Sequence, residues 1–353
     1  MSDETNFLNA AKLMENATAD IDIVRSKSEA GIDAAHVMDM ILKSTGDGSY
    51  NTQFQNWFSR MDRFGRDTMP ANSVHSGMTF ITRPCLNLTS ACIRQSRVLA
   101  PLDTTNPRST AFAIRCLLDT KFQANNIDIV NNSPLLDPYN PFFIPLCKGL
   151  SSINGWPDPI MQTRTTEGGF HSEDLTVALG SDQLNKSYDL SLQFKDIPNG
   201  PIAAIFLSWL EYMQHVTKGT MTAYKEHIDA QQINYSVSIY RFLLDPTRRF
   251  ITHYAKATGC FPKSVPMGAI INMNENELYV EAAKRLSIPF MSNKVEYNDY
   301  AILLDFNRLV ERYCPHVKES ATLEALPINN YTGIPYIETN KHGIELVFKD
   351  VHK

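Results

Sequence analysis

An alternation of apolar and polar residues over 188–195 constrains the fold of this chain more than any other feature. In YDLSLQFK the apolar side chains occupy every second position: Tyr188, Leu190, Leu192 and Phe194. Successive side chains of an extended chain point to opposite faces, so these four share one face and the polar residues share the other. The pattern predicts a strand with one buried face.

An amphipathic helix is predicted directly after this strand, over residues 202–216. Pro201 has the fixed φ that suits a first helical turn, and Gly219 follows as a C-cap residue. The apolar stripe of IAAIFLSWLEYMQHV includes Phe206 and Trp209. Both side chains should be buried, and a charged residue at either position should prevent folding.

An interrupted strand, ITHYAKATGCFPKSVPMGAIIN, occupies residues 251–272. It begins as a β-strand and then passes through Gly259, Pro262 and Pro266. Glycine and proline inside a strand are typical of bulges, bends and sheet corners. We therefore expect these three residues to redirect the chain at a corner of the sheet, in a role that concerns shape and assembly.

The remaining elements are expected at both ends of the chain and around this core. Strands are predicted at 77–83, at 233–245 and 249–257 as a hairpin, at 277–290, and at 334–350 as a last hairpin. Apolar residues three or four apart predict helices in 5–44 and in 296–314. Asp299, Asp305 and Glu311 should lie on the solvated side of the later helix.

A proline-rich insertion is expected at about 86–160. Helical pieces are predicted at 89–100 and 107–120, followed by NNIDIVNNSPLLDPYNPFFIPL. Pro134, Pro138, Pro141 and Pro145 argue against regular helix or central strand there. The apolar residues between them predict an ordered, packed segment.

Composition excludes several classes of function. The net charge is −5, with 33 basic and 38 acidic residues, which argues against a protein that grips nucleic acid through a basic face. The six cysteines form no CxxC pair, which indicates reduced, buried thiols in a cytosolic protein. We expect no secretory signal in the acidic N-terminus, and no membrane span, since no apolar run approaches roughly 18 residues.

The sequence contains none of the short motifs that mark common catalytic or cofactor sites. It lacks GxGxxG, GxxxxGK[ST], HExxH and GxSxG. A hydrolase would have to use residues such as His171, within HSED, or Cys260. A solvated loop and a buried thiol explain these two residues better. We therefore predict no catalytic residue, no cofactor and no metal.

Three isolated basic or imidazole positions also have ordinary explanations. His253 lies on the outer side of its predicted strand and should be a surface residue. Arg83 and the pair Arg248-Arg249 lie near strand ends, and ion pairs within the sheet or between subunits are expected there.

Three stretches, taken in order, resemble one family. They are MTFITRP (78–84), YDLSLQFKDIPNGPIAAIFLSWLEYM (188–213), and HYAKATGCFPKSVP (253–266) followed by SIPF (287–290). This order is similar to that of the tail tube proteins and baseplate tube-initiation proteins of contractile-tailed bacteriophages. The resemblance covers 76–84 and 186–295.

The resemblance implies a fold and a function. The fold would be α+β and mainly β: an antiparallel tube-fold sandwich or barrel with a flanking helix, an N-terminal helical segment and an insertion. The function would be that of a virion structural protein, assembled in the host cytoplasm, that forms a ring of the tail tube or of the tube–baseplate junction. Its partners would be copies of itself in a sixfold ring, neighbouring tube, sheath or baseplate proteins, and DNA that passes through unbound.

The expected domain organisation follows the same scheme. Residues 1–70 form a helical arm that docks on a neighbour or caps its own subunit, 71–325 form the β domain with the insertion, and 326–353 form a C-terminal hairpin extension. Two alternatives remain: a head–tail neck or tail-terminator ring protein, and a cytosolic hydrolase. The predicted structural and assembly residues are Trp209, Phe206, Gly259, Pro262 and Pro266.

Overall fold

The computed structural model describes residues 76–131, 133, 136–167, 174–181, 186–196, 200–245, 249–271, 285–322, 333–340 and 343–350. The predicted N-terminal helices, His171 and the turn residues 341–342 lie outside these ranges. The chain divides into two compact units. The larger comprises Met78–Phe242, Tyr254–Tyr336 and Phe348–Lys353, and the smaller comprises Met1–Gly77, Leu243–His253 and Ile337–Val347.

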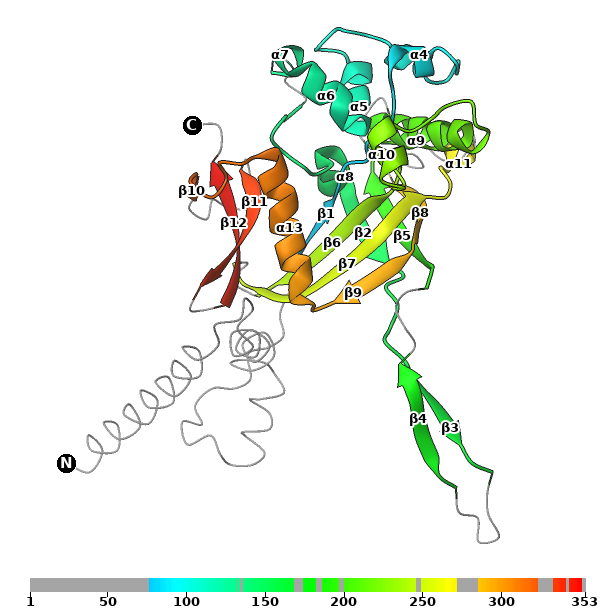
Figure 1. Cartoon of the computed structure of the whole chain (residues 1–353), viewed down its shortest axis with the longest axis vertical. Helices are drawn as coiled ribbons and strands as arrows, with labels where there is room; N and C mark the ends of the chain where they lie inside the picture. The colour runs from blue at the N-terminus through cyan, green and yellow to red at the C-terminus, as the bar shows by residue number, and fades with distance from the viewer. Residues whose placement is uncertain are drawn as a thin grey trace, which may run out of the picture. The chain divides into compact units, whose positions relative to one another are not determined.

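A seven-stranded sheet forms the centre of the fold (Figure 1). Its order is β1-β6-β7-β8-β5-β2, and β9 pairs with β7 beside this path. The pairs β2–β5, β5–β8, β7–β8 and β7–β9 are all antiparallel. The strands are β1 Ser76–Ile81, β2 Leu150–Asn154, β5 Tyr188–Lys195, β6 Val237–Leu244, β7 Ile251–Pro262, β8 Arg285–Ser292 and β9 Lys294–Tyr297.

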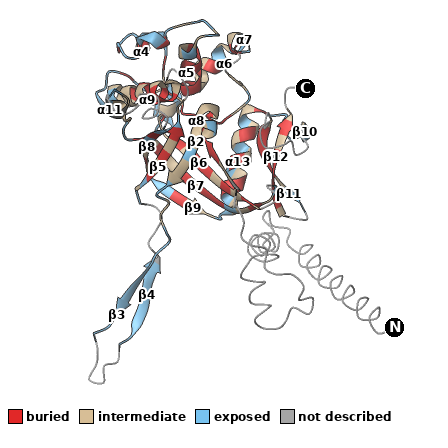
Figure 2. Cartoon of the chain, turned by 180° about the vertical axis from the view of Figure 1, so that it is seen from behind, coloured by how far each residue is buried: buried red, intermediate tan, exposed pale blue. Residues whose placement is uncertain are grey.

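Helix α9, Pro201–Thr217, covers the buried face of β5 as the sequence predicts. Gly200 (φ +61°) leads into the helix and Gly219 (φ +72°) follows it, both in the left-handed region that favours glycine. Phe206 stacks against Trp209 with ring centroids 6.1 Å apart, and it meets Phe194 of β5 at 5.3 Å. Figure 2 shows the buried residues of the sheet and of this helix in red.

The insertion is ordered but more broken than the sequence predicts. The expected helix 89–100 is a single turn, α4 (Ser90–Ile93), followed by a 3₁₀ turn η1 (Ala100–Leu102) that contains a proline. Pro145 does not exclude a helix, because it occupies the first turn of α8, where a missing N–H costs nothing. The other helices here are α5 Thr110–Leu118, α6 Thr120–Asn125, α7 Ile127–Val130 and α8 Ile144–Gly149. The short helices α10 Lys225–Asp229 and α11 Met267–Ile271 follow later in the chain.

Helix α13, Tyr300–Tyr313, packs its apolar stripe against an aromatic cluster. The ring of Phe306 lies within 5.4 Å of the rings of four aromatic residues: Phe80, Phe142, Tyr240 and Phe242. The acidic residues predicted on the solvated side all have partners. Asp299 caps the helix through the Ala301 N–H, Asp305 accepts from Tyr240 and Lys256, and Glu311 accepts from Tyr336 and Lys318.

The C-terminal strands form a separate three-stranded sheet in the order β10-β12-β11. They are β10 Ala321–Thr322, β11 Ile334–Asn340 and β12 Gly343–Asp350, and the last two are the predicted C-terminal strand pair. Within the smaller unit, buried Glu345 accepts hydrogen bonds from Arg249 Nε at 2.8 Å and from Asn340 Nδ2 at 2.7 Å. Arg249 therefore forms an ion pair within the chain with a residue of β12, where the sequence predicts a pair within its own sheet or between subunits.

The observed architecture agrees with the predicted class: α+β, mainly β, antiparallel, with a flanking helix. In the part of the chain that the structure describes, none of the helices has both the length and the apolar character that crossing a membrane requires. The same part contains no group of three or more His, Cys, Asp or Glu side chains arranged to hold a metal ion.

Candidate functional site

The interrupted strand is continuous through its glycine and bends there. Residues Ala255–Thr258 of β7 pair with β9, and Phe261 and Pro262 pair with β8, without a shift of register. Asn293, between β8 and β9, lies opposite Gly259, and its N–H donates to the Thr258 carbonyl at 3.1 Å. Gly259 itself has φ +68°, in the left-handed region that favours glycine, and its predicted role in redirecting the chain at a sheet corner stays a prediction.

The two prolines of this stretch lie beyond the bend. Pro262 is buried as the last residue of β7, opposite Phe290. Pro266 directly precedes α11, where its carbonyl accepts from the Ile270 N–H. Pro262 ends the strand and Pro266 precedes the next helix.

Of the two residues that a hydrolase would use, the structure describes only Cys260, because His171 lies outside the described residues. Cys260 is fully buried, and that burial raises the pKa of its thiol to about 12. A thiol is nucleophilic only when it is ionised, so this one is inert near neutral pH. His253 is exposed on the same strand, as expected.

A second β-hairpin, which we call the exposed hairpin, is the feature that sequence reasoning missed. It consists of β3 (Met161–Thr165) and β4 (Thr176–Ser181), which form a sheet of their own. All five residues of β3 are exposed, and Figure 2 shows both strands in the colour of exposed residues. Alternation in LTVALGS was the available signal, but a strand without a buried face gives only a weak pattern.

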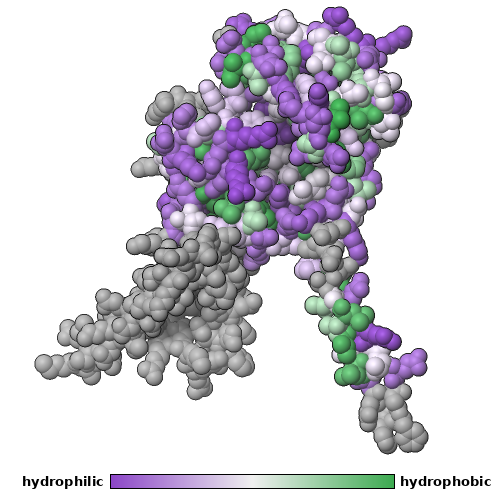
Figure 3. Space-filling model, viewed as in Figure 1, coloured by the Kyte–Doolittle hydropathy of each residue, from purple (hydrophilic) through white to green (hydrophobic). Residues whose placement is uncertain are grey.

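The exposed hairpin carries apolar side chains that the described residues do not cover. Leu175 and Val177 share one face by alternation and are 64% and 50% exposed, and Arg164, the cross-strand partner of Val177, lies on the same face. Leu179, 63% exposed, is the extra residue of a β-bulge between the pairs Gln162–Gly180 and Thr163–Ala178. The other face holds Thr163, Thr165 and Thr176. Figure 3 shows the apolar residues gathered on this hairpin.

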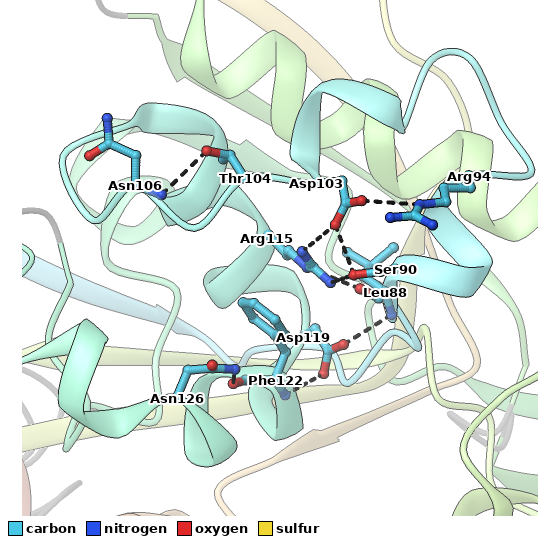
Figure 4. Close-up of polar contacts among 10 residues, drawn as sticks. All are labelled: Leu88, Ser90, Arg94, Asp103, Thr104, Asn106, Arg115, Asp119, Phe122 and Asn126. Carbon is cyan, nitrogen blue, oxygen red and sulfur yellow. Dashed lines mark hydrogen bonds and ion pairs between the residues drawn. The ribbon is translucent and has the colours of Figure 1, made fainter.

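A polar cluster around Asp119 holds the insertion together (Figure 4). The Asp119 carboxylate is fully buried and accepts from the Tyr224 hydroxyl at 2.7 Å, the Leu88 N–H at 3.0 Å and the Phe122 N–H at 2.9 Å. Burial raises the pKa of this carboxyl above its ordinary value, because the charged form is poorly solvated. The contacts join three segments that are distant in the sequence, which is a structural role.

The outer part of the same cluster is more accessible. Asp103 accepts from the Ser90 hydroxyl at 2.8 Å and pairs with Arg115 at 3.2 Å and Arg94 at 3.4 Å. The hydrogen bond from Ser90 and the two arginines lower the pKa of Asp103. Arg115 also donates to the Leu88 carbonyl at 3.0 Å. Because the Leu88 N–H donates to Asp119, Arg115 connects the contacts of Asp103 with those of Asp119.

Arg83 corrects one expectation from the sequence. It is 8% exposed, and its guanidinium donates to backbone carbonyls of Leu117 and Asn140, each at 3.4 Å, and to the side chain of Gln123. Burial lowers the pKa of this group. It therefore satisfies carbonyl oxygens between β1 and the insertion, where an ion pair was expected.

Three solved structures show limited similarity to the chain, each over 42% of its length. They are the anti-feeding prophage tube-terminating cap (13% identity, 78% of that chain, TM-score 0.26), the sheath–tube complex of the extracellular contractile injection system PVC in its extended state (14%, 79%, 0.24), and the sheath/tube terminator of PVC (13%, 84%, 0.23). TM-scores this low do not establish a shared fold.

The sequence itself gives the family. No curated protein matches it. Residues 23–345 match the model of the family described as "Putative phage tail tube protein". Because this match spans most of the sequence, the chain belongs to that family of phage tail tube proteins.

Proposed function

We propose that this protein is a virion structural protein whose copies form a closed ring, sixfold in symmetry, in the tail tube or at the tube–baseplate junction of a phage. The ring forms a conduit for DNA, and its partners are further copies, the sheath and baseplate proteins. It is assembled in the host cytoplasm. Family membership supports the tail tube assignment, and the ring, its symmetry and its position are the proposal.

The exposed hairpin is the observation that carries the proposal. Leu175, Val177 and Leu179 are each at least half exposed on one short element. Burying an aliphatic side chain of this size contributes roughly 1.5–3 kcal/mol, so three of them favour a docked state. A hairpin on one copy that docks on a different surface of the next is a heterologous contact, and such contacts form a ring when the rotation between neighbouring copies closes.

The five residues predicted from the sequence take part indirectly. Phe206 and Trp209 pack α9 on the sheet, Gly259 has a left-handed backbone within β7, Pro262 ends that strand, and Pro266 precedes α11. In this proposal they shape the subunit and do not touch a neighbouring copy.

Charge supports passage of DNA without binding. The net charge of −5 disfavours phosphate contacts, which dominate the affinity of proteins for DNA. A ring built from such subunits lets DNA slide.

The test is assembly of the purified chain at rising concentration, followed by light scattering after size exclusion and by negative-stain microscopy. Val177→Asp places a charge on the apolar face of the hairpin, and Thr163→Asp places the same charge on the other face as a matched control. We expect rings or stacked tubes from the wild type and from Thr163→Asp, and folded monomers from Val177→Asp.

Two results would overturn this assignment. One is a wild-type chain that stays monomeric at every concentration. The other is a Val177→Asp variant that assembles as well as Thr163→Asp, which would show that the apolar face is not the contact. Circular dichroism on each variant verifies that the subunit is folded.

A further inference from the structure

The chain enters the exposed hairpin through a segment that is fixed on the central sheet. Directly after β2, Gly155 has φ +97°, and a Cβ at this position would lie 2.4 Å from the Asp189 carbonyl oxygen of β5. Any other residue would collide with this neighbouring strand. The glycine therefore allows the outgoing chain to lie in direct backbone contact with β5.

The next two residues are held by a single tyrosine of β9. The Trp156 ring packs on the core and lies 6.2 Å from the Tyr297 ring, measured between centroids. The Tyr297 hydroxyl donates to the Pro157 carbonyl at 2.5 Å. Burial raises the pKa of Tyr297 to about 12, so the hydroxyl keeps its proton and remains a donor at neutral pH.

The four residues that include this contact form a stiff segment. The sequence Trp156-Pro157-Asp158-Pro159 has two fixed φ angles, and each residue before a proline is restricted to extended conformations. Because only one residue separates Pro157 from Pro159, the backbone has little conformational freedom before β3 begins at Met161. An orientation fixed at Trp156 is therefore passed on to the strand.

We propose that Gly155, Trp156 and Tyr297 are positioning residues that set the angle at which the exposed hairpin leaves the sheet. The bend at Gly259 contributes, because it determines where β9, and with it Tyr297, lies relative to β5. The hairpin arrives at its partner already oriented, so little conformational entropy is lost on docking. The assembly part of this inference rests on the proposed function, but the orientation part does not.

The orientation is measured in the monomer. Spin labels on unnatural amino acids at Arg164, on the hairpin, and Arg285, on β8, leave the six cysteines unchanged, and the Val177→Asp background prevents assembly. Pulsed electron resonance gives the distribution of distances between the labels. Tyr297→Phe removes only the hydroxyl, Trp156→Ala removes the ring contact, and Tyr235→Phe is a control that deletes a tyrosine hydroxyl elsewhere on the core.

We expect a narrow distribution of label distances in the Val177→Asp reference and in its Tyr235→Phe derivative. The distribution should be clearly broader in Tyr297→Phe and in Trp156→Ala. In the otherwise wild-type chain, Tyr297→Phe should raise the concentration needed for assembly, because a hairpin with a wider range of orientations loses more conformational entropy on docking. Its thermal unfolding midpoint should stay close to that of Tyr235→Phe, which separates positioning from general stability.

A broad distribution in the reference, or equal distributions in all variants, would overturn the inference whatever happens to assembly. If the distances respond as expected but the wild-type chain never assembles, the proposed ring fails and the positioning role stands. The two proposals are thus tested by different readouts.

Discussion

Gly259 of β7 lies directly opposite Asn293, and a Cβ on the glycine would lie 2.9 Å from the asparagine Nδ2. The two residues mark the point where β7 exchanges one partner strand for the other. The contact is close because the backbone bends here, and φ of +68° makes the bend accessible to glycine.

Gly259→Ala should therefore destabilise the protein. A left-handed conformation costs an L-residue about 1–2 kcal/mol, and displacement of Asn293 adds to it. Urea unfolding of the purified chain measures the loss. Gly268→Ala is the matched control, because this glycine lies in α11 with nothing within 4 Å of its added Cβ. Equal midpoints for the two variants would show that the bend does not depend on glycine.

Trp209→Ala should cost about 3–5 kcal/mol of unfolding free energy, the usual result of removing a large buried aromatic side chain. The indole is fully buried, and its Nε1 donates to the Tyr235 carbonyl at 3.1 Å. Gln214→Ala, on the exposed side of the same helix, should change stability by less than about 0.5 kcal/mol. A functional particle that carries Trp209→Asp would contradict the placement of α9.

Asp119 and Asp103 should respond to pH in opposite directions. The pKa of Asp119 is raised in the folded protein, so its favourable contribution is present below its ordinary pKa and is lost as the pH rises through the folded value. The pKa of Asp103 is lowered, so its contribution is present above its ordinary pKa and is lost as the pH falls through the folded value.

The measurement is urea unfolding of wild type, Asp119→Asn and Asp103→Asn at a series of pH values from acid to neutral. The difference in unfolding free energy between wild type and Asp119→Asn should decrease as the pH rises. The corresponding difference between wild type and Asp103→Asn should increase as the pH rises. Slopes of the same sign would show that burial does not control Asp119.

Asp305→Ala should destabilise the contact of α13 with the sheet by about 1–3 kcal/mol, because it leaves two polar groups without an acceptor. They are the Tyr240 hydroxyl, 2.5 Å from the carboxylate, and the Lys256 ammonium, 2.7 Å away on a side chain that is 13% exposed. Burial raises the pKa of Asp305, but the hydrogen bonds from Lys256 and Tyr240 lower it more. Glu319→Ala, at a side chain that is 85% exposed, is the control and should be nearly neutral in thermal unfolding.

The sequence predicts those parts of the fold where burial is periodic. A half-buried strand leaves a period of two residues, which identifies the strand Tyr188–Lys195. A surface helix leaves a period of 3.6 residues, which identifies the apolar stripe that contains Phe206 and Trp209. Gly259 was found because few residues tolerate a bend inside a strand. These features are local, and they account for the central sheet and its flanking helix.

The remainder depends on contacts between distant segments. Nothing near Arg83 in the sequence shows that carbonyls of Leu117 and Asn140 surround its guanidinium, and nothing near Asp119 indicates Tyr224 as its donor. The exposed hairpin was missed for a different reason, since residues that are exposed on both faces carry no burial signal. Its positioning residue Tyr297 is 140 positions away from Pro157.

The buried thiols have a consequence for the durability of the particle. Desolvation raises the pKa of the buried Cys116 and Cys260 and of the half-buried Cys147 to about 12 each, so these thiols stay protonated near neutral pH. Oxidation by dissolved oxygen or peroxide proceeds through the thiolate. These three sulfur atoms should therefore react slowly with dissolved oxygen or peroxide when the protein passes from a reducing to an aerated medium.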